Sequence, residues 1–275
     1  MAIIKARAKI NLFFQIIGKR MDGYHLIESL NVFANDIYDL IEINPANFNS
    51  TIINGGECAE SLINEENNLI NKALDTFSGN SKYHCQLTKN IPIRAGLGGG
   101  SADAAMVAKF LEPTADISSK LLSIGADLPT CYYNEPAFCS GIGEIIKPLK
   151  NFPNLYLVLI NPKKTLLTKD VFKHNQHINT PIIKNKPLDF FNDLNNLISF
   201  ISPLKNDLSE AAIQLLPEIK IILDLLGKQN GCLISRMSGS GPTCFAIFTN
   251  KETALQANKT ITNELPNYWV KYTSA

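Results

Sequence analysis

Residues 92–105 read PIRAGLGGGSADAA, and this stretch decides how the whole chain is interpreted. It places Gly96, Gly98, Gly99 and Gly100 between a predicted strand at about 83–88 and a predicted helix at about 101–111. Glycine permits left-handed backbone and close approach of a ligand to the main chain. The first turn of a helix adds unpaired N–H groups and a positive dipole end. The pattern therefore predicts a phosphate site, and the alternative is a flexible turn before a capped helix.

Two widespread phosphate motifs do not fit this loop. A P-loop requires a lysine after its last glycine, but Ser101 follows Gly100 directly. A dinucleotide fingerprint requires a third glycine where Ser101 stands. Ser101 could cap the helix, contact a phosphate or hold a metal. A second loop, Met237–Pro242 (MSGSGP), lies between two apolar runs and is either a hairpin turn or a second wall of the same anionic pocket.

The start of the chain alternates between apolar and polar side chains from Ile4 to Ile16. This period of two predicts a long strand or hairpin with one core face. Lys9 and Asn11 lie on the polar face, where a solvated side chain is the ordinary expectation. Helices and strands alternate on both sides of a junction near 150–154, which predicts an α+β protein. We expect strands at about 37–43, 51–53, 155–160, 232–236, 243–248 and 268–273, and helices at about 67–77, 117–125, 169–174, 207–215, 217–227 and 251–264.

The composition is that of an ordinary globular protein: 275 residues, 45% hydrophobic, 19% charged and a net charge of +1. That balance argues against a protein that coats nucleic acid. No apolar run approaches the ~18 residues of a membrane span. None of the six cysteines forms a CxxC pair, which favours reduced, structural thiols. Charges at Lys5, Arg7 and Lys9 interrupt any signal-peptide core, so we expect a cytoplasmic protein.

Several separated stretches resemble one family. Residues 92–105 are similar to the central phosphate loop of the GHMP kinases, which transfer phosphate to small molecules. Residues 8–14 (AKINLFF), 18–25 (GKRMDGYH), 125–129 (GADLP) and 237–241 (MSGSG) resemble more specifically the family of 4-diphosphocytidyl-2-C-methyl-D-erythritol kinases. The matching stretches follow in order along nearly the whole chain.

The resemblance implies a fold and an activity. The fold is a two-domain GHMP kinase, with a ribosomal S5 domain 2-like, ATP-binding domain over 1–152 and a ferredoxin-like, substrate-side domain over 153–275. The activity is phosphorylation of the 2-hydroxyl of 4-diphosphocytidyl-2-C-methyl-D-erythritol, in the non-mevalonate route to isoprenoids. ATP is the co-substrate and Mg²⁺ accompanies it. No nucleic-acid or membrane partner is implied, and the oligomeric state is left open.

The resemblance also implies roles for individual residues. Asp127 becomes the general base and Lys9 its cationic partner, while Ser101 is the candidate Mg²⁺ ligand. The positions implied to bind ATP are Asn68, Leu69, Lys89, Pro92, Ala95, Gly96, Leu97, Gly98, Gly99, Gly100, Ser101, Ala102 and Asp103. The positions implied to bind the substrate are Asn11, Tyr24, His25, Thr168, Phe172, Gly239, Ser240 and Gly241. Among these, Tyr24, His25 and Phe172 match a clamp for cytidine.

Departures from the family pattern occur at three single positions and over the 168–172 segment, which is divergent. Arg94 stands where a small residue is frequent, Ala102 replaces a frequent serine, and Pro242 replaces a commoner alanine. Two alternatives stay open: a kinase for another small alcohol such as homoserine or mevalonate, and a nonenzymatic nucleotide or RNA binder. Tyr24 and His25 argue against the first, because a cytosine clamp has no use there. The pairing of Lys9 with Asp127 and the small net charge argue against the second.

Overall fold

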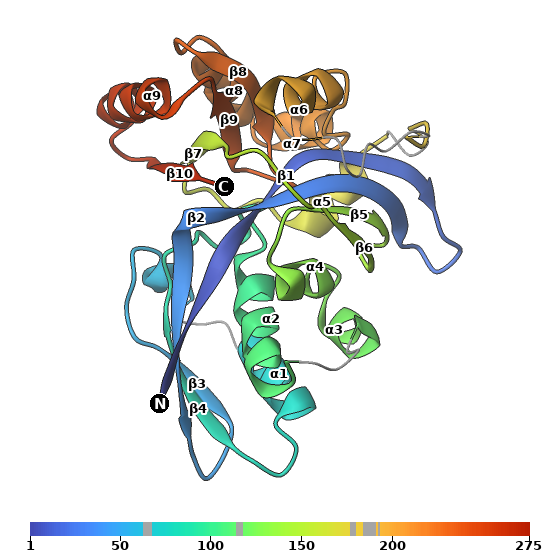
Figure 1. Cartoon of the computed structure of the whole chain (residues 1–275), viewed down its shortest axis with the longest axis vertical. Coiled ribbons are helices and arrows are strands. Elements are labelled where there is room, and N and C mark those ends of the chain that lie inside the picture. The colour runs from blue at the N-terminus through green and yellow to red at the C-terminus, as the bar shows by residue number, and fades with distance from the viewer. Residues whose placement is uncertain (63–67, 114–117, 177–179, 184–190, 192) are drawn as a thin grey trace.

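Two β-sheets, each accompanied by helices, make up the computed structural model of the chain (Figure 1). The structure describes residues 1–62, 68–113, 118–176, 180–183, 191 and 193–275. Helices and strands are mixed along the chain, so the predicted α+β class is confirmed. Within the described residues, no helix has the length and apolar character needed to cross a bilayer.

The first sheet is built on a long antiparallel hairpin of β1 (Ala2–Lys19) and β2 (His25–Pro45). Two strands share the other edge of β2: β5 (Ala137–Gly141) pairs with residues 27–31, and β4 (Tyr83–Thr88) pairs with residues 40–45. β3 (Ser50–Ile53) runs parallel to β4, and β6 (Ile145–Pro148) pairs with β5. The strand order is therefore β3-β4-β2-β5-β6, with β1 on β2.

Helix α2 (Gly99–Leu111) packs against the first sheet and lies between its neighbouring helices. The alanines of α2 are buried among strand residues such as Ile41 and Leu87, and their small size lets the helix approach the sheet closely. The other elements of this half are η1 (Ala59–Leu62), α1 (Leu69–Phe77), α3 (Ser118–Ile124) and α4 (Leu128–Tyr133).

The second sheet is antiparallel, in the order β10-β7-β9-β8. This is the strand order expected of the predicted ferredoxin-like half. Its strands are β7 (Tyr156–Asn161), β8 (Cys232–Met237), β9 (Cys244–Phe248) and β10 (Trp269–Ser274). Its helices are α5 (Thr168–His174), α6 (Leu194–Ile201), α7 (Ser209–Leu215), α8 (Glu218–Gly227) and α9 (Lys251–Glu264).

One hydrophobic cluster joins the two sheets. It contains Phe13 and Leu30 from the hairpin together with Leu157, Phe245 and Trp269 from the second sheet. In the sequence, β6 of the first sheet and β7 of the second sheet lie on either side of the predicted domain boundary at 152/153. The division into domains at this position stays a prediction. β1 belongs to the first sheet, but its second half also packs against residues of the second sheet, so it is covered on both sides there. The expectation of a single core face on β1 is therefore wrong there.

Several elements escape prediction from sequence. β5 and β6 are short, and β6 is largely exposed, so cross-strand pairing rather than local pattern specifies them. α4 contains Pro129 and two tyrosines in six residues, which are weak helix formers. α6 lies in an Asn-rich stretch, where the Asp193 carboxylate accepts a 2.8 Å hydrogen bond from the N–H of Asn196 and starts the helix.

Candidate active site

A cavity of about 950 Å³ lies where β1, the 92–101 loop, α4, α5 and the 237–242 loop meet. It is also lined by the hairpin turn before β2 and the start of α1. The predicted site residues that line it are Lys9, Asn11, Tyr24, His25, Asn68, Leu69, Lys89, Pro92, Ala95, Gly96, Gly98, Gly99, Gly100, Ser101, Asp103, Asp127, Thr168, Phe172, Gly239 and Ser240. Residues distributed over most of the sequence are thus brought to one place.

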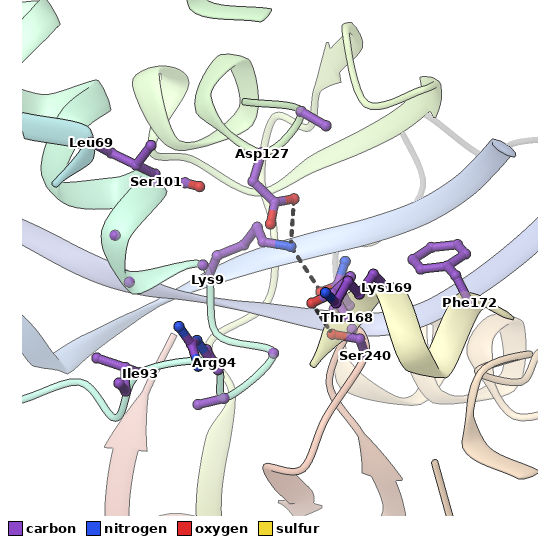
Figure 2. A pocket seen from close by; sticks show the side chains of 18 of the residues that line it. Lys9, Leu69, Ile93, Arg94, Ser101, Asp127, Thr168, Lys169, Phe172 and Ser240 are labelled. Atoms are coloured by element: carbon purple, nitrogen blue, oxygen red, sulfur yellow. Dashed lines mark hydrogen bonds and ion pairs between the residues drawn. The ribbon is translucent and has the colours of Figure 1, made fainter. Parts of the chain in front are cut away.

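Lys9 projects from β1 toward Asp127 (Figure 2). The pairing of β1 with β2 is irregular on both sides of Lys9, between Arg7 and Lys9 and between Asn11 and Phe13, and such bulges redirect side chains. The ammonium lies 3.1 Å from the Asp127 carboxylate, and the Lys9 side chain is only 4% exposed. Burial alone would lower the pKa of Lys9, but the charge and hydrogen bond of Asp127, together with Cys131 and Cys139, outweigh it and the pKa is raised. The ammonium is therefore fully protonated at neutral pH.

Asp127 occupies the N-cap position of α4, yet its side chain makes no capping hydrogen bond. The carboxylate is instead directed at Lys9, and the Asp127 side chain is 50% exposed. The Asp127 side chain therefore does not cap the helix. The arrangement offers a carboxylate that can accept a proton from a hydroxyl in the cavity, beside a fixed positive charge.

The glycine loop is fastened to both neighbouring segments. The N–H of Lys9 donates to the carbonyl of Leu97 at 2.9 Å, which ties the loop to β1. The Ser238 hydroxyl donates to the carbonyl of Gly96 at 2.8 Å and accepts from the N–H of Asn11 at 3.1 Å. The 237–242 loop is therefore the second wall of the cavity rather than only a hairpin turn.

The N-terminus of α2 opens into the cavity. Gly98 is the left-handed N-cap (φ 62°), and Gly98, Gly99, Gly100 and Ser101 line the cavity wall. The first N–H groups of a helix have no partner within it, so this end can bind an anion. Gly99 has a different reason to be glycine, because a Cβ there would lie 3.0 Å from Ile91 and 3.1 Å from the Lys89 ammonium.

Beneath the loop lies a buried ionic triad of Lys89, Asp39 and Asp103. The Lys89 ammonium is hydrogen-bonded to Asp39 and lies 2.7 Å from Asp103. Asp39 also accepts from the N–H of Ile91 at 2.9 Å. Burial and the neighbouring Asp39 raise the pKa of Asp103 well above its usual value. The Lys89 and Asp103 side chains thus support the loop from inside, and their implied contacts with ATP stay a prediction.

Asn11, which the resemblance implies to contact the substrate, lines the cavity but is hydrogen-bonded within the protein. Its side chain is 1% exposed. Its Oδ1 accepts a 2.9 Å hydrogen bond from the Lys9 ammonium, and its Nδ2 donates to Ser29 and Asn31 at 2.8 and 2.7 Å. The Asn11 amide thus holds the Lys9 ammonium, and its implied contact with the substrate stays a prediction.

The far end of the cavity is aromatic. The His25 and Phe172 rings are 4.9 Å apart at their centroids and tilted by 31°, while Tyr24 is 55% exposed. Rings at this separation contact each other, so a planar ligand would stack on their open face rather than between them. Burial and nearby Lys19 lower the pKa of His25, so its imidazole is neutral at pH 7. Thr168 and Ser240 join α5 to the second loop by a 2.9 Å hydrogen bond between their hydroxyls.

Two family models match parts of this chain, and named relatives match nearly all of it. Residues 68–135 match the model "GHMP kinases N terminal domain", and residues 189–267 match "GHMP kinases C terminal". A 4-diphosphocytidyl-2-C-methyl-D-erythritol kinase of Roseobacter denitrificans is 38% identical over 276 residues, covering 98% of this chain and 91% of the relative. The kinase of that name from Wolbachia pipientis wMel is 38% identical over 282 residues, covering 97% and 96%.

The chain belongs to the 4-diphosphocytidyl-2-C-methyl-D-erythritol kinase family of GHMP kinases. The resemblance drawn from the motifs is thereby confirmed. Solved structures agree on the fold. A 4-(cytidine 5'-diphospho)-2C-methyl-D-erythritol kinase superimposes with a TM-score of 0.78 at 24% identity, covering 99% of this chain and 98% of that one. A homoserine kinase from Cytophaga hutchinsonii gives a TM-score of 0.68 at 15% identity, covering 99% and 93%.

Three residues implied to contact ATP or the substrate are not among those that line the cavity, and their contacts stay predictions. Leu97 and Ala102 are buried core residues, and Gly241 packs against Met237, so none of the three lines the cavity. Lys169 does line it and was not predicted. Its spacing from Phe172 in the sequence could have indicated this position, because residues three apart on a helix share a face.

Arg94 is the departure from the family pattern with the clearest structural consequence. Its φ of 49° is left-handed, a conformation that disfavours side chains other than glycine or asparagine, yet Arg94 lines the cavity. In Figure 2 it lies on the side of Lys9 opposite Ser101. A strained cation at this position suggests that nucleotide binding benefits from its charge.

We expect Arg94→Gly to weaken ADP binding about fivefold and to raise the unfolding free energy by about 0.5–1 kcal/mol, because glycine relieves the left-handed strain. Isothermal titration and thermal melting measure the two effects. Lys163→Gly is the matched control, since Lys163 has a φ of 56° and does not line the cavity. It should gain stability without any change in ADP affinity. Equal ADP affinity in both variants would show that the Arg94 charge has no part in binding.

Proposed function

We propose that this chain transfers the γ-phosphoryl group of ATP to the 2-hydroxyl of 4-diphosphocytidyl-2-C-methyl-D-erythritol, a step of the non-mevalonate isoprenoid route. A bond forms between the hydroxyl oxygen and the γ-phosphorus, and the bond from that phosphorus to the β–γ bridging oxygen breaks. ADP leaves, and the hydroxyl proton passes to Asp127. The observation that carries the proposal is one cavity holding the Lys9–Asp127 pair, a free helix N-terminus and an aromatic end.

Lys9 and Asp127 supply the chemistry of the acceptor. The Asp127 carboxylate takes the proton as the new bond forms, a contribution of about 10²–10⁴-fold for a positioned base. The Lys9 ammonium, buried and held by Asn11, stabilises negative charge developing between the acceptor oxygen and the phosphoryl group. Phosphoryl transfer otherwise asks mainly for positioning and charge neutralisation.

The nucleotide site is proposed at the N-terminus of α2. Backbone N–H groups of Gly99, Gly100 and Ser101 bind the phosphates, and Asn68 and Leu69 lie at the adenine end. Asn68 also caps α1, because its Oδ1 accepts a 2.9 Å hydrogen bond from the N–H of Ile70. That bond leaves the Asn68 amide N–H groups as the donors for a base.

Mg²⁺ fits this site as a companion of the nucleotide. Among the described residues, no cluster of three His, Cys, Asp or Glu side chains could hold a metal alone. Mg²⁺ commonly keeps several waters and takes phosphate oxygens with one or two protein oxygens. The Ser101 hydroxyl, at the open end of α2, is the candidate protein ligand (Figure 2). When bound, Mg²⁺ neutralises phosphate charge during transfer.

The acceptor's cytidine is proposed at the aromatic end. His25 and Phe172 offer a stacking face, and the neutral His25 ring can hydrogen-bond the edge of a base. A kinase for homoserine or mevalonate would have no use for this surface. A nonenzymatic RNA binder would have no use for the Lys9–Asp127 pair.

The experiment is an ADP-release assay with ATP and Mg²⁺, run with the cytidyl substrate, homoserine and mevalonate in parallel. Release confined to the cytidyl substrate supports the proposal. Release with homoserine or mevalonate would indicate a kinase for another small alcohol. If ATP binds but no alcohol is phosphorylated, a salt-sensitive RNA gel shift would favour the nonenzymatic alternative.

We expect Phe172→Ala to raise KM for the cytidyl substrate about tenfold, because stacking on an aromatic ring is worth about 1–3 kcal/mol per base. The ADP dissociation constant should stay within about twofold, since Phe172 is remote from the nucleotide end of the cavity. Phe110→Ala is the control, because Phe110 is 44% exposed on α2 and lies outside the cavity. An unchanged KM in Phe172→Ala would remove Phe172 from cytidine binding.

A further inference from the structure

A closed ring of interactions surrounds the Lys9–Asp127 pair. From Lys9 it passes to Asn11 Oδ1 at 2.9 Å, and Asn11 Nδ2 donates to Asn31 Oδ1 at 2.7 Å. Asn31 Nδ2 then donates to Cys139 Sγ at 3.0 Å. These hydrogen bonds therefore connect Lys9 on β1, through Asn31 on β2, to Cys139 on β5.

The ring returns to Asp127 through α4. Cys139 Sγ lies 3.1 Å from the hydroxyl of Thr130, three residues beyond Asp127 at the start of that helix. The ion pair of 3.1 Å between Lys9 and Asp127 completes the circuit. The Lys9 ammonium is thus held by this set of side chains, and Asp127 is joined to them by the ion pair and by the first turn of α4.

Strand register explains why these side chains meet. Asn11 and Asn31 are direct partners across β1 and β2, and Ser29 is the partner of Cys139 across β2 and β5. The polar side chains therefore form a row across three neighbouring strands. Ser29 anchors the row by donating to the carbonyl of Phe13 at 2.7 Å.

The Lys9 ammonium sets the direction of the hydrogen bonds that the two asparagine amides make. It can only donate, so Asn11 must present its oxygen to Lys9 and its NH₂ to Asn31. Asn31 must then present its oxygen to Asn11 and its NH₂ to Cys139. Asn31, Cys139 and Thr130 are each 2–3% exposed, so water cannot replace a lost member. Buried networks of this kind are rigid only when every member is satisfied.

We propose that Asn31 and Cys139 are positioning residues, which act through Asn11 and Thr130 to fix the Lys9 ammonium relative to the Asp127 carboxylate. Their effect on turnover rests on the proposed phosphoryl transfer. Neither residue touches a ligand in this account. A displacement of about 1 Å in a reacting group can cost up to about 100-fold in rate, so loss of the ring should reduce kcat.

The test compares Cys139→Ala, Cys139→Ser and Cys85→Ala. Cys139→Ala should lower kcat about tenfold with KM for ATP within about twofold, because the nucleotide site is untouched. Cys139→Ser, which restores a hydroxyl donor and acceptor, should recover most of the lost kcat. Cys85→Ala truncates a thiol that is also fully buried but lies outside the ring, and kcat should not change.

A second readout needs no turnover. In ¹⁵N-lysine-labelled protein, NMR should detect the slowly exchanging Lys9 ammonium of wild type, because it is buried and held by two acceptors. The signal should broaden or disappear in Cys139→Ala and in Asn31→Leu, and persist in Cys139→Ser. If the wild-type protein lacks kinase activity but the Lys9 signal behaves in this way, the proposed reaction is wrong, and the proposed positioning of Lys9 by the ring is still supported.

Two results would overturn the positioning role. One is a Cys139→Ala enzyme with wild-type kcat and an unchanged Lys9 ammonium signal. The other is equal loss of kcat in Cys139→Ala, Cys139→Ser and Cys85→Ala, which would mean that the buried thiols affect only general stability.

Discussion

Asp127→Asn is expected to lower kcat by at least about 100-fold, the usual scale for losing a general base. The amide keeps the shape of the side chain but cannot take the acceptor's proton. The Asp127 side chain caps nothing, so α4 should form normally and thermal stability should change little. ADP should bind within about twofold of wild type, because the backbone N–H groups of α2 are unaffected.

Asp224→Asn provides a matched control for this variant. The Asp224 side chain is 51% exposed, against 50% for Asp127, and it also pairs with a lysine, Lys220. It lies on α8, outside the cavity, so the same chemical change should leave kcat unaltered. Turnover by Asp127→Asn close to that of Asp224→Asn would remove Asp127 from the mechanism.

Gly96→Ala is expected to weaken ADP binding at least tenfold and to destabilise the fold by about 3 kcal/mol. A Cβ on Gly96 would lie 2.1 Å from the carbonyl oxygen of Ser238 and 2.8 Å from the nitrogen of Gly241. Both contacts are backbone atoms that cannot rotate away, and φ is +73°. The two loops must therefore separate, which breaks the hydrogen bond from Ser238 to Gly96.

Thermal melting and ADP titration measure this effect, with Gly227→Ala as the control. Gly227 ends α8, and its added Cβ would meet only the Ser235 hydroxyl at an ordinary 3.5 Å. That variant should melt close to wild type and bind ADP normally. If Gly96→Ala behaves in the same way, the two loops are not joined as described.

The sequence allowed much of the fold to be predicted because local signals agreed. The alternation in β1, the Gly-rich start of α2 and the Pro at the start of α8 each indicated their elements directly. The first half of β2 and the short strand β5 pair with each other although they are far apart in sequence, and β6 is a short, largely exposed strand beside β5. No local pattern carries that information.

The site was predictable where motifs mark it, and not where packing defines it. Lys9, Asp127 and the loop glycines belong to recognisable motifs, and the structure brings them together. The burial of Asn11 and Lys89 was not predictable, because it depends on Asn31 and Asp39 across strand pairs. In the sequence, polar residues that alternate with apolar ones along a strand indicate a solvated face. The structure shows instead that the second sheet covers this face.

The most direct test of the central claim is ³¹P NMR of wild-type protein incubated with ATP, Mg²⁺ and 4-diphosphocytidyl-2-C-methyl-D-erythritol. We predict one new phosphomonoester resonance that grows in step with ADP, while the cytidyl diphosphate signals remain. Appearance of inorganic phosphate alone would contradict the account, because the γ-phosphoryl group would then pass to water and not to the alcohol.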